Sequence, residues 1–548
     1  TGPRPCDSRT LRLGLRTLTV SRDRDEWGES FALTVNGVRI FAMGANYIPE
    51  DALFPRIRPE RTRRLLEDCV AAHFNCLRVW GGGYYPDDFF YDLCDELGLL
   101  VWQDLMYACN VYSLERGFAE EAEAEARENI RRIRHHACLG LWCGNNELEW
   151  GWVEWPDMAS HSMKLRADYV RLFEQILPNA VREEDPQTFY WPSSPSSGGC
   201  FDAPNDGSRG DTHYWEVWHL LKPITAYRDH FFRFCSEFGF QSFPCLRTVE
   251  SFTIPGDRNI FSQVMESHQK NGAANGRILA YLADTYLYPK DFDSLLYVSQ
   301  LLQAEAIRCG VEHWRRHRGR CMGALYWQLN DNWPVASWSG IDHAHRWKAL
   351  HHAARRFFAP RMATAAEDGL RASLFIHNET LAPFEGVLSV RLLTTDLEVL
   401  EARQVAVRVP ALSVHPALDL DVSEPAARVG AERLVAAFDL AIDGHVESCG
   451  TTLFVAPKHL ALTQVEYDVS VEEQADAYAI TVRAPVYCRA VELWFDDMDP
   501  VLSDNFFDLV SPGGRTVWLD KRQLPEPLSA DDLAGRLRIR SLADSYEA

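Results

Sequence analysis

The 548-residue sequence predicts an α/β fold, a (β/α)8 TIM barrel followed by two β-sandwich (immunoglobulin-like) domains. Eight short apolar stretches alternate with helix-like stretches from about residue 37 to residue 360, the pattern of a barrel with insertions. After Pro360 short alternating stretches separated by turn residues replace the helices. We therefore expect a catalytic barrel over 37–360, one sandwich over 361–456 and a second over 457–548.

Residues 1–36 precede the barrel and read as strands. "LRLGLRTLTV" and "ESFALTV" alternate apolar and polar residues, and Asn36-Gly37 is a hairpin signal. The segment opens without Met and in the middle of a β pattern. We expect it to be the remnant of an upstream β-sandwich domain.

The barrel strands and helices are identified by their periodicity. Pro59 suits the first turn of a helix whose apolar residues fall on one face, and further helices are predicted over 119–136, 292–317 and 345–358. The eight predicted strands are "RIFAMGAN", "NCLRVWG", "LLVWQDL", "CLGLWCGNNE", "TFYWPSS", "DTHYW", "FRFCSEFG" and "MGALYWQLND".

Composition excludes several classes of partner. A net charge of −22 disfavours nucleic acid, which selects basic surfaces, and no apolar run is long enough to cross a membrane. The 14 cysteines have no metal-ligand spacing, so we expect no metal and a reducing, cytoplasmic compartment. The sequon at Asn378 leaves a lysosomal or secreted location as the alternative.

Two of the eight predicted strands end in glutamate, the fourth at Glu147 and the seventh at Glu237. Active sites of such barrels lie at the C-terminal ends of the strands, and strands four and seven lie on opposite sides. The two carboxylates can therefore converge across the mouth. A facing pair is what glycoside hydrolysis requires, at a separation of roughly 5–5.5 Å in retaining enzymes.

Other polar residues at the strand ends are candidates for supporting roles. We expect Arg78 to orient Glu237 and Asp104 to be an anchor. Glu149 competes with Glu147, but its place beyond the strand predicts a loop-facing side chain or a salt bridge. Gly81-Gly82-Gly83 lacks the spacing of a phosphate-binding loop, and the pairs His135-His136 and His351-His352 read as surface residues of amphipathic helices.

Four motifs together resemble the β-mannosidases of glycoside hydrolase family 2: "NCLRVWGGGYYPDDFF", "LGLWCGNNELEWGW", "FCSEFGFQSFP" and "ALYWQLNDNWPVASWSGID". The resemblance implies a retaining exo-acting enzyme without metal or organic cofactor that removes terminal β-mannose. It makes Glu147 the acid/base and Glu237 the nucleophile, and assigns Asn146 to the sugar 2-hydroxyl. The aromatic residues that it implies around the terminal sugar are Trp80, Trp155, Tyr214 and Trp327.

Alternatives stay open at this point. A β-galactosidase, β-glucuronidase or exo-β-glucosaminidase would share the fold and the carboxylates, and a non-catalytic sugar-binding barrel is the more distant reading. The expected partner is an oligosaccharide or glycoconjugate, and assembly as a homodimer is left open. Because the resembling family carries a sandwich over the barrel mouth, we expect this chain alone to hydrolyse β-mannosides poorly or not at all.

Overall fold

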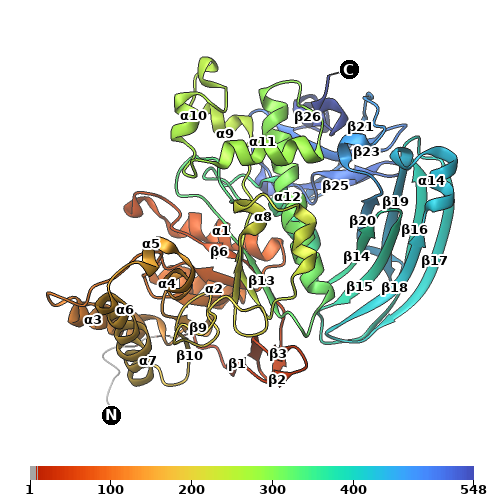
Figure 1. The fold of residues 1–548 in the computed structure, drawn as a ribbon. Coiled ribbons are helices and arrows are strands. Elements are labelled where there is room, and N and C mark those ends of the chain that lie inside the picture. Colours follow the sequence, from red (N-terminus) through yellow and green to blue (C-terminus); the bar gives the residue numbers. More distant parts are fainter. Residues whose placement is uncertain (1–7, 9, 11, 548) are drawn as a thin grey trace, which may run out of the picture.

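The computed structural model describes residues 8, 10 and 12–547. Eight parallel strands form one sheet in the order β10-β9-β8-β7-β6-β13-β12-β11, so the first barrel strand pairs with the last (Figure 1). All eight predicted strands are confirmed. The strands are β6 (Ala42–Tyr47), β7 (Cys76–Val79), β8 (Leu100–Asp104), β9 (Leu139–Cys143), β10 (Phe189–Trp191), β11 (Thr212–Tyr214), β12 (Cys235–Phe238) and β13 (Gly323–Tyr326).

The barrel has one seam, between β10 and β11. Within residues 12–547 no regular ladder joins these strands, and a single bridge pairs Ser196 with Asp211. Side chains close the gap instead. Asp211 accepts hydrogen bonds from the Trp191 indole at 2.7 Å and the Ser194 hydroxyl at 2.6 Å.

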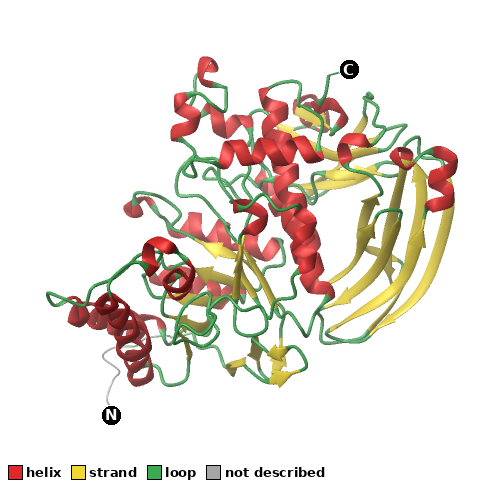
Figure 2. Ribbon diagram, in the orientation of Figure 1, coloured by secondary structure: helices red, strands yellow, loops and turns green. Residues whose placement is uncertain are grey.

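Helices surround the sheet as the periodicity predicts (Figure 2). Pro59 opens α1, and α12 begins where the Asp291 side chain caps the backbone N–H of Ser294 at 2.7 Å. The last helix starts four residues later than predicted because Asp342 holds the preceding loop by accepting the N–H groups of Ala344 and Arg346. The helices are α1 (Pro59–Ala71), α2 (Asp88–Leu97), α3 (Phe118–Ile133), α4 (Leu148–Glu154), α5 (Pro156–Ala159), α6 (Met163–Arg171), α7 (Leu177–Glu184), α8 (Glu216–His219), α9 (Leu246–Glu250), α10 (Gln263–Ser267), α11 (Ala274–Thr285), α12 (Phe292–Arg316) and α13 (Ala349–Phe357).

The strands before the barrel pack into its N-terminal end. β1 (Leu18–Ser21), β4 (Ala32–Val35) and β5 (Val38–Arg39) form a small antiparallel sheet beside the hairpin of β2 (Arg24–Asp25) and β3 (Gly28–Glu29). Leu18, Phe31 and Leu33 share one buried cluster with Trp102 and Trp191 of the barrel. This segment therefore serves as the floor of the barrel, opposite the strand ends that carry the polar residues.

Two antiparallel sandwiches follow the barrel, as predicted, and α12 lies between the barrel strands and the first of them (Figure 1). Each sandwich encloses its own apolar cluster. The first pairs the sheet of β14 (Arg361–Asp368), β15 (Arg371–Asn378) and β18 (Ser413–Asp421) with that of β17 (Val399–Val409), β16 (Phe384–Thr394), β19 (Leu434–Ile442) and β20 (His445–Leu453). The second pairs β21 (Asp468–Glu473), β22 (Ala477–Arg483) and β25 (Arg515–Asp520) with β24 (Phe507–Leu509), β23 (Cys488–Phe495) and β26 (Leu537–Arg540).

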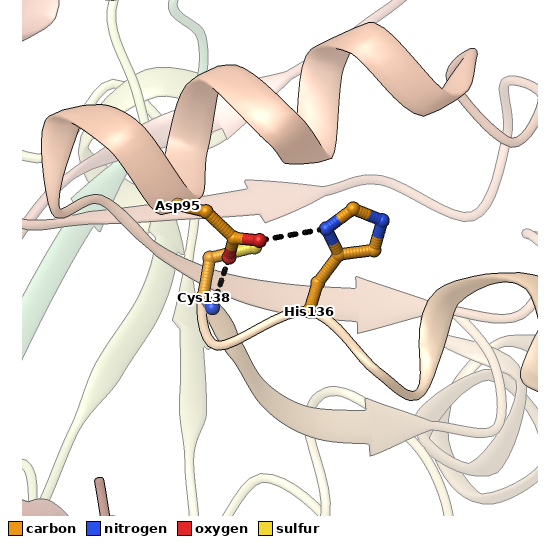
Figure 3. A group of neighbouring side chains, drawn as sticks. All are labelled: Asp95, His136 and Cys138. Atoms are coloured by element: carbon orange, nitrogen blue, oxygen red, sulfur yellow. Dashed lines mark hydrogen bonds and ion pairs between the residues drawn. The ribbon is translucent and has the colours of Figure 1, made fainter. Parts of the chain in front are cut away.

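The prediction of surface histidines is wrong at three of the four positions. His351 and His352 are buried on α13, where the second sandwich covers the helix and Phe506 contacts the His352 ring. His136 is also buried, and its Nδ1 lies 2.8 Å from Asp95 Oδ2 (Figure 3). Packing between elements distant in sequence, which the helical pattern does not report, covers these rings. In the described part of the chain, no helix combines the length and the apolar character needed to cross a membrane.

Candidate active site

The chain turns sharply at Glu147, between the end of β9 and the start of α4. Glu147 has φ 64°, a left-handed backbone conformation that is costly for a residue with a side chain. Its N–H donates to the Ser194 carbonyl at 2.8 Å, and the Asn145 amide oxygen accepts the N–H of Leu148 at 3.0 Å. The turn aims the Glu147 carboxylate over the barrel mouth.

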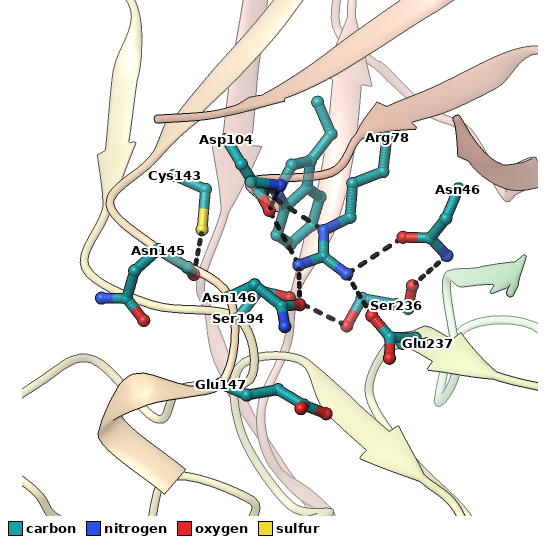
Figure 4. Close-up of polar contacts among 12 residues, drawn as sticks. Asn46, Arg78, Asp104, Cys143, Asn145, Asn146, Glu147, Ser194, Ser236 and Glu237 are labelled. Atoms are coloured by element: carbon teal, nitrogen blue, oxygen red, sulfur yellow. Dashed lines mark hydrogen bonds and ion pairs between the residues drawn. The ribbon is translucent and has the colours of Figure 1, made fainter. Parts of the chain in front are cut away.

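Glu237, in β12, faces Glu147 from the other side of the barrel (Figure 4). One carboxylate oxygen of each glutamate and one ring nitrogen of His213 all lie within 4.8 Å of one another. Both carboxylates are at least nine-tenths buried. The nearest oxygens are therefore closer than the roughly 6.5–9.5 Å between the carboxyl groups of inverting glycosidases, and they are compatible with the roughly 5–5.5 Å of retaining ones.

Arg78 of β7 lies at the centre of the polar network and is fully buried (Figure 4). Its Nη1 donates to Glu237 Oε2 at 2.8 Å, and its Nη2 donates to Asp104 Oδ2 at 2.9 Å. Asp104 in turn accepts the Gly81 N–H at 3.0 Å. The predicted orientation of Glu237 by Arg78 is therefore present in the structure, with Asp104 holding the other edge of the guanidinium.

Asn146 also depends on Arg78, whose Nη2 donates to the amide oxygen at 2.7 Å. That contact fixes which way the amide points, because an arginine can only donate. The Asn146 NH2 group then faces Cys109, with Nδ2 3.3 Å from Sγ. The Cys109 thiol itself donates to Glu147 Oε2 at 3.4 Å. Cys109 thus bridges Asn146 and Glu147, a contact that its place in a loop after β8 did not predict.

His213 is the second residue that sequence reasoning missed. Its Nδ1 lies 2.8 Å from Glu147 Oε1. Burial and the charge of Arg78 lower the pKa of His213 well below its usual value, so the ring is neutral. The nearby Arg78 Nη1, 3.4 Å from Nε2, offers only hydrogens, which places the ring proton on Nδ1 and directs it at Glu147.

The two glutamates have unequal surroundings. Burial and the negative charge of Glu237 raise the pKa of Glu147 to about 8. Burial also raises the pKa of Glu237, but Arg78 opposes that shift through its charge and its hydrogen bond, leaving the value at about 7. The proton shared by such a pair therefore resides on Glu147, and Glu237 is the first to ionise.

Three of the four predicted aromatic residues follow barrel strands on the side that carries the carboxylates: Trp80 follows β7, Trp327 follows β13 and Trp155 lies at the end of α4. The rings of Trp80 and Trp327 meet edge to face, with centroids 4.8 Å apart. Trp155 packs against Trp150, whose ring centroid lies 6.5 Å from that of His213.

Tyr214 is the exception. Its ring packs against Tyr227, His230 and Phe232, away from the carboxylates. Its neighbour Trp215 points inward instead and donates its indole N–H to Glu237 Oε1 at 3.2 Å. Side chains alternate along an extended chain, so His213 of β11 and Trp215, the residue after the strand, point inward on either side of Tyr214.

Glu149 faces a loop, which is one of the two arrangements predicted for it. It is fully buried on α4 and forms no ion pair within the described part of the chain. The Ser196 hydroxyl donates to it at 2.6 Å and the Phe201 N–H at 2.9 Å. Burial raises the pKa of Glu149 to about 7. Glu149 therefore anchors the loop between β10 and β11 and does not compete with Glu147 for the site.

Two groups of side chains in the described residues have the donor atoms of a metal site. One is the pair of glutamates with His213. The other, Asp95 with His136 and Cys138, lies outside the barrel mouth (Figure 3). There Asp95 accepts the His136 ring N–H and the Cys138 backbone N–H, at 2.8 and 2.6 Å. Both Asp95 oxygens thus have hydrogen-bond partners, which is the arrangement of a structural anchor.

The comparisons with known proteins cover the whole fold. A mannosidase Ig/CBM-like domain model matches residues 371–459, and an Ig-fold domain model matches residues 462–545. The chain is 33% identical to β-mannosidase B of Aspergillus niger over 545 residues, covering 93% of this chain and 63% of that protein. It is 37% identical to β-mannosidase B of Emericella nidulans over 363 residues, covering 64% of this chain and 43% of that protein.

Solved structures show the same relationship. The β-D-mannosidase of Dictyoglomus thermophilum superimposes with a TM-score of 0.89 at 31% identity, over 96% of this chain and 63% of that one. An exo-chitosanase of Amycolatopsis orientalis shares the fold at 16% identity, with a TM-score of 0.76 over 97% of this chain and 66% of that one. The chain spans slightly less than two thirds of the length of these mannosidases. The chain is therefore similar to the β-mannosidases of Aspergillus niger and Dictyoglomus thermophilum over more than nine tenths of its length.

Proposed function

We propose that this chain carries the catalytic barrel of a retaining exo-acting β-mannosidase, which hydrolyses terminal non-reducing β-D-mannose from oligosaccharides or glycoconjugates. The observation that carries the proposal is the facing pair of buried glutamates, within 4.8 Å of each other, of which only Glu237 is paired with an arginine. The assignment of mannose as the sugar rests on the similarity to proteins named β-mannosidase.

The unequal surroundings assign the roles. Glu237, held ionised by Arg78, attacks the anomeric carbon, while Glu147 donates its proton to the leaving oxygen. The glycosyl–enzyme ester is then opened by water, which Glu147 deprotonates. Glu147 can serve both steps because its pKa, raised to about 8, lies near the operating pH.

The remaining side chains bind and orient the sugar. The Asn146 NH2 group, turned away from Arg78, is placed to donate to the 2-hydroxyl, whose axial orientation separates mannose from glucose. Trp80 and Trp327 offer apolar ring surface for the C–H faces of the pyranose. The neutral His213 donates to Glu147 Oε1 and leaves Oε2 to carry the catalytic proton.

A panel of nitrophenyl β-glycosides tests the proposal. The chain should release nitrophenol faster from the β-mannoside than from the β-galactoside, β-glucuronide or β-glucosaminide, and the first mannose formed should be the β-anomer by proton NMR. Preference for another sugar would replace the mannosidase assignment with the corresponding glycosidase. Failure of the full-length protein to cleave any member of the panel would contradict the proposed activity, and an α-anomer would contradict the retaining mechanism.

A further inference from the structure

Gly81, Gly82 and Gly83 follow Trp80, which is the first residue after β7. Gly82 is exposed, so burial does not demand a glycine there. Its φ also lies outside the left-handed range that favours glycine. The reason for the missing side chain must therefore be sought in what surrounds Gly82.

The Trp80 indole occupies the space that a side chain at Gly82 would need. A Cβ atom added to Gly82 would lie 1.9 Å from Cη2 and 2.1 Å from Cζ3 of that indole. Atoms cannot approach so closely, so any other residue at this position would have to displace the ring. The same ring meets Trp327 edge to face, at 4.8 Å between centroids. We call the contacting rings of Trp80 and Trp327 the aromatic wall. Displacement of Trp80 would therefore disturb both residues of this wall.

We propose that Gly82 is a positioning residue for the sugar site, whose missing side chain sets the orientation of Trp80 and, through it, the wall shared with Trp327. The inference rests on the proposed function only in taking a sugar as the ligand that contacts Trp80 and Trp327. The adjacent Gly81 is linked to the nucleophile through hydrogen bonds. Its N–H donates to Asp104, Asp104 accepts a hydrogen bond from Arg78, and Arg78 also donates to Glu237. One short loop thus contacts the supports of both the sugar wall and Glu237.

A double-mutant cycle tests this role. In Gly82→Ala we expect kcat/KM on an aryl β-mannoside to fall by about ten- to a hundredfold, the usual cost of a small misplacement, with Tm unchanged. Trp80→Phe removes the six-membered part of the indole that the new Cβ would strike. Adding Gly82→Ala to Trp80→Phe should then lower kcat/KM little further, because the two residues act through one contact.

Gly450 provides the matched control. A Cβ there would lie 2.5 Å from Cζ of Phe438 inside the first sandwich, a clash of the same kind far from the barrel mouth. Gly450→Ala should lower Tm and leave kcat/KM unchanged. The proposal would be overturned by an unchanged kcat/KM in Gly82→Ala, or by equal losses from Gly82→Ala in the wild-type chain and in the Trp80→Phe variant.

The position of the indole separates this inference from the proposed function. In a crystal structure of Gly82→Ala, the Trp80 ring should be rotated away from its wild-type place against Trp327. An undisplaced ring would overturn the positioning role, whatever the enzyme hydrolyses. If the full-length wild-type protein cleaves no glycoside while the ring moves as expected, the proposed function fails and the positioning of Trp80 by Gly82 stands.

Discussion

Replacing Arg78 by Met would leave two buried carboxylates without their positive charge. Arg78 bonds Glu237 at 2.8 Å and Asp104 at 2.9 Å, and all three side chains are buried. Loss of one partner of a buried ion pair costs about 3–5 kcal/mol of stability, so Tm should fall. An arginine at this distance lowers a carboxyl pKa by about 1–3 units. The acid limb of kcat/KM, set by ionisation of Glu237 with a pKa of about 7, should therefore move upward by about 1 unit and meet the basic limb that Glu147 sets at about 8.

The assay is the pH dependence of kcat/KM on an aryl β-mannoside. Arg78→Lys distinguishes the effect of the positive charge from that of the guanidinium geometry. It also allows the pH dependence to be measured if the Met variant does not fold. It keeps a positive charge but cannot bond Asp104, Asn146 and Glu237 together, so kcat/KM should fall while the acid limb moves less than in the Met variant. The control is Arg233→Met, which breaks the pair between the buried Arg233 and the partly exposed Asp25 at the barrel floor. Arg233→Met should lower Tm without moving the acid limb of kcat/KM. An acid limb that does not move in Arg78→Met would refute the reasoning.

Two further predictions concern titration of buried glutamates. Glu147 must be protonated to act as the acid, and its pKa is raised to about 8, so activity should fall above that pH. Glu147→Gln should abolish this basic limb when it is assayed on a substrate with an activated leaving group. A basic limb that persists in Glu147→Gln would exclude Glu147 as its source. Glu149 has a pKa raised from 4.5 to about 7, so the native state holds its proton more tightly and the free energy of unfolding should decline by roughly 3 kcal/mol between these values. Denaturant unfolding of Glu149→Gln should show a correspondingly flatter pH dependence, and an unchanged slope would contradict this assignment.

The barrel could be predicted from sequence because each strand is a short apolar run that ends in polar residues. That pattern located Glu147 and Glu237 at the mouth, and the barrel geometry brought them together. The inward-facing residues of β11 are harder to predict from sequence, because the strand has only three residues. A shift of one residue exchanges the side chains that point into the barrel with those that point outward. The resemblance assigns Tyr214 to the sugar site, whereas in the structure His213 and Trp215 contact the two glutamates.

Long-range packing buries Glu149 and explains the error over the histidines. Glu149 is buried by a loop some fifty residues later in the chain, where Ser196 and Phe201 supply its hydrogen bonds. His352 is covered by Phe506 of the last domain. A local pattern describes one face of a helix as polar, but it does not report which distant segment will cover that face.

The configuration of an azide product tests most directly whether Glu237 is the nucleophile. Glu237→Ala should turn over an activated aryl β-mannoside negligibly without azide. The vacated space should admit azide on the face opposite the leaving group, and NMR should identify an α-mannosyl azide as the product. A β-mannosyl azide would mean that Glu237 is the acid/base and that the two roles are reversed, and full activity without azide would place the nucleophile elsewhere.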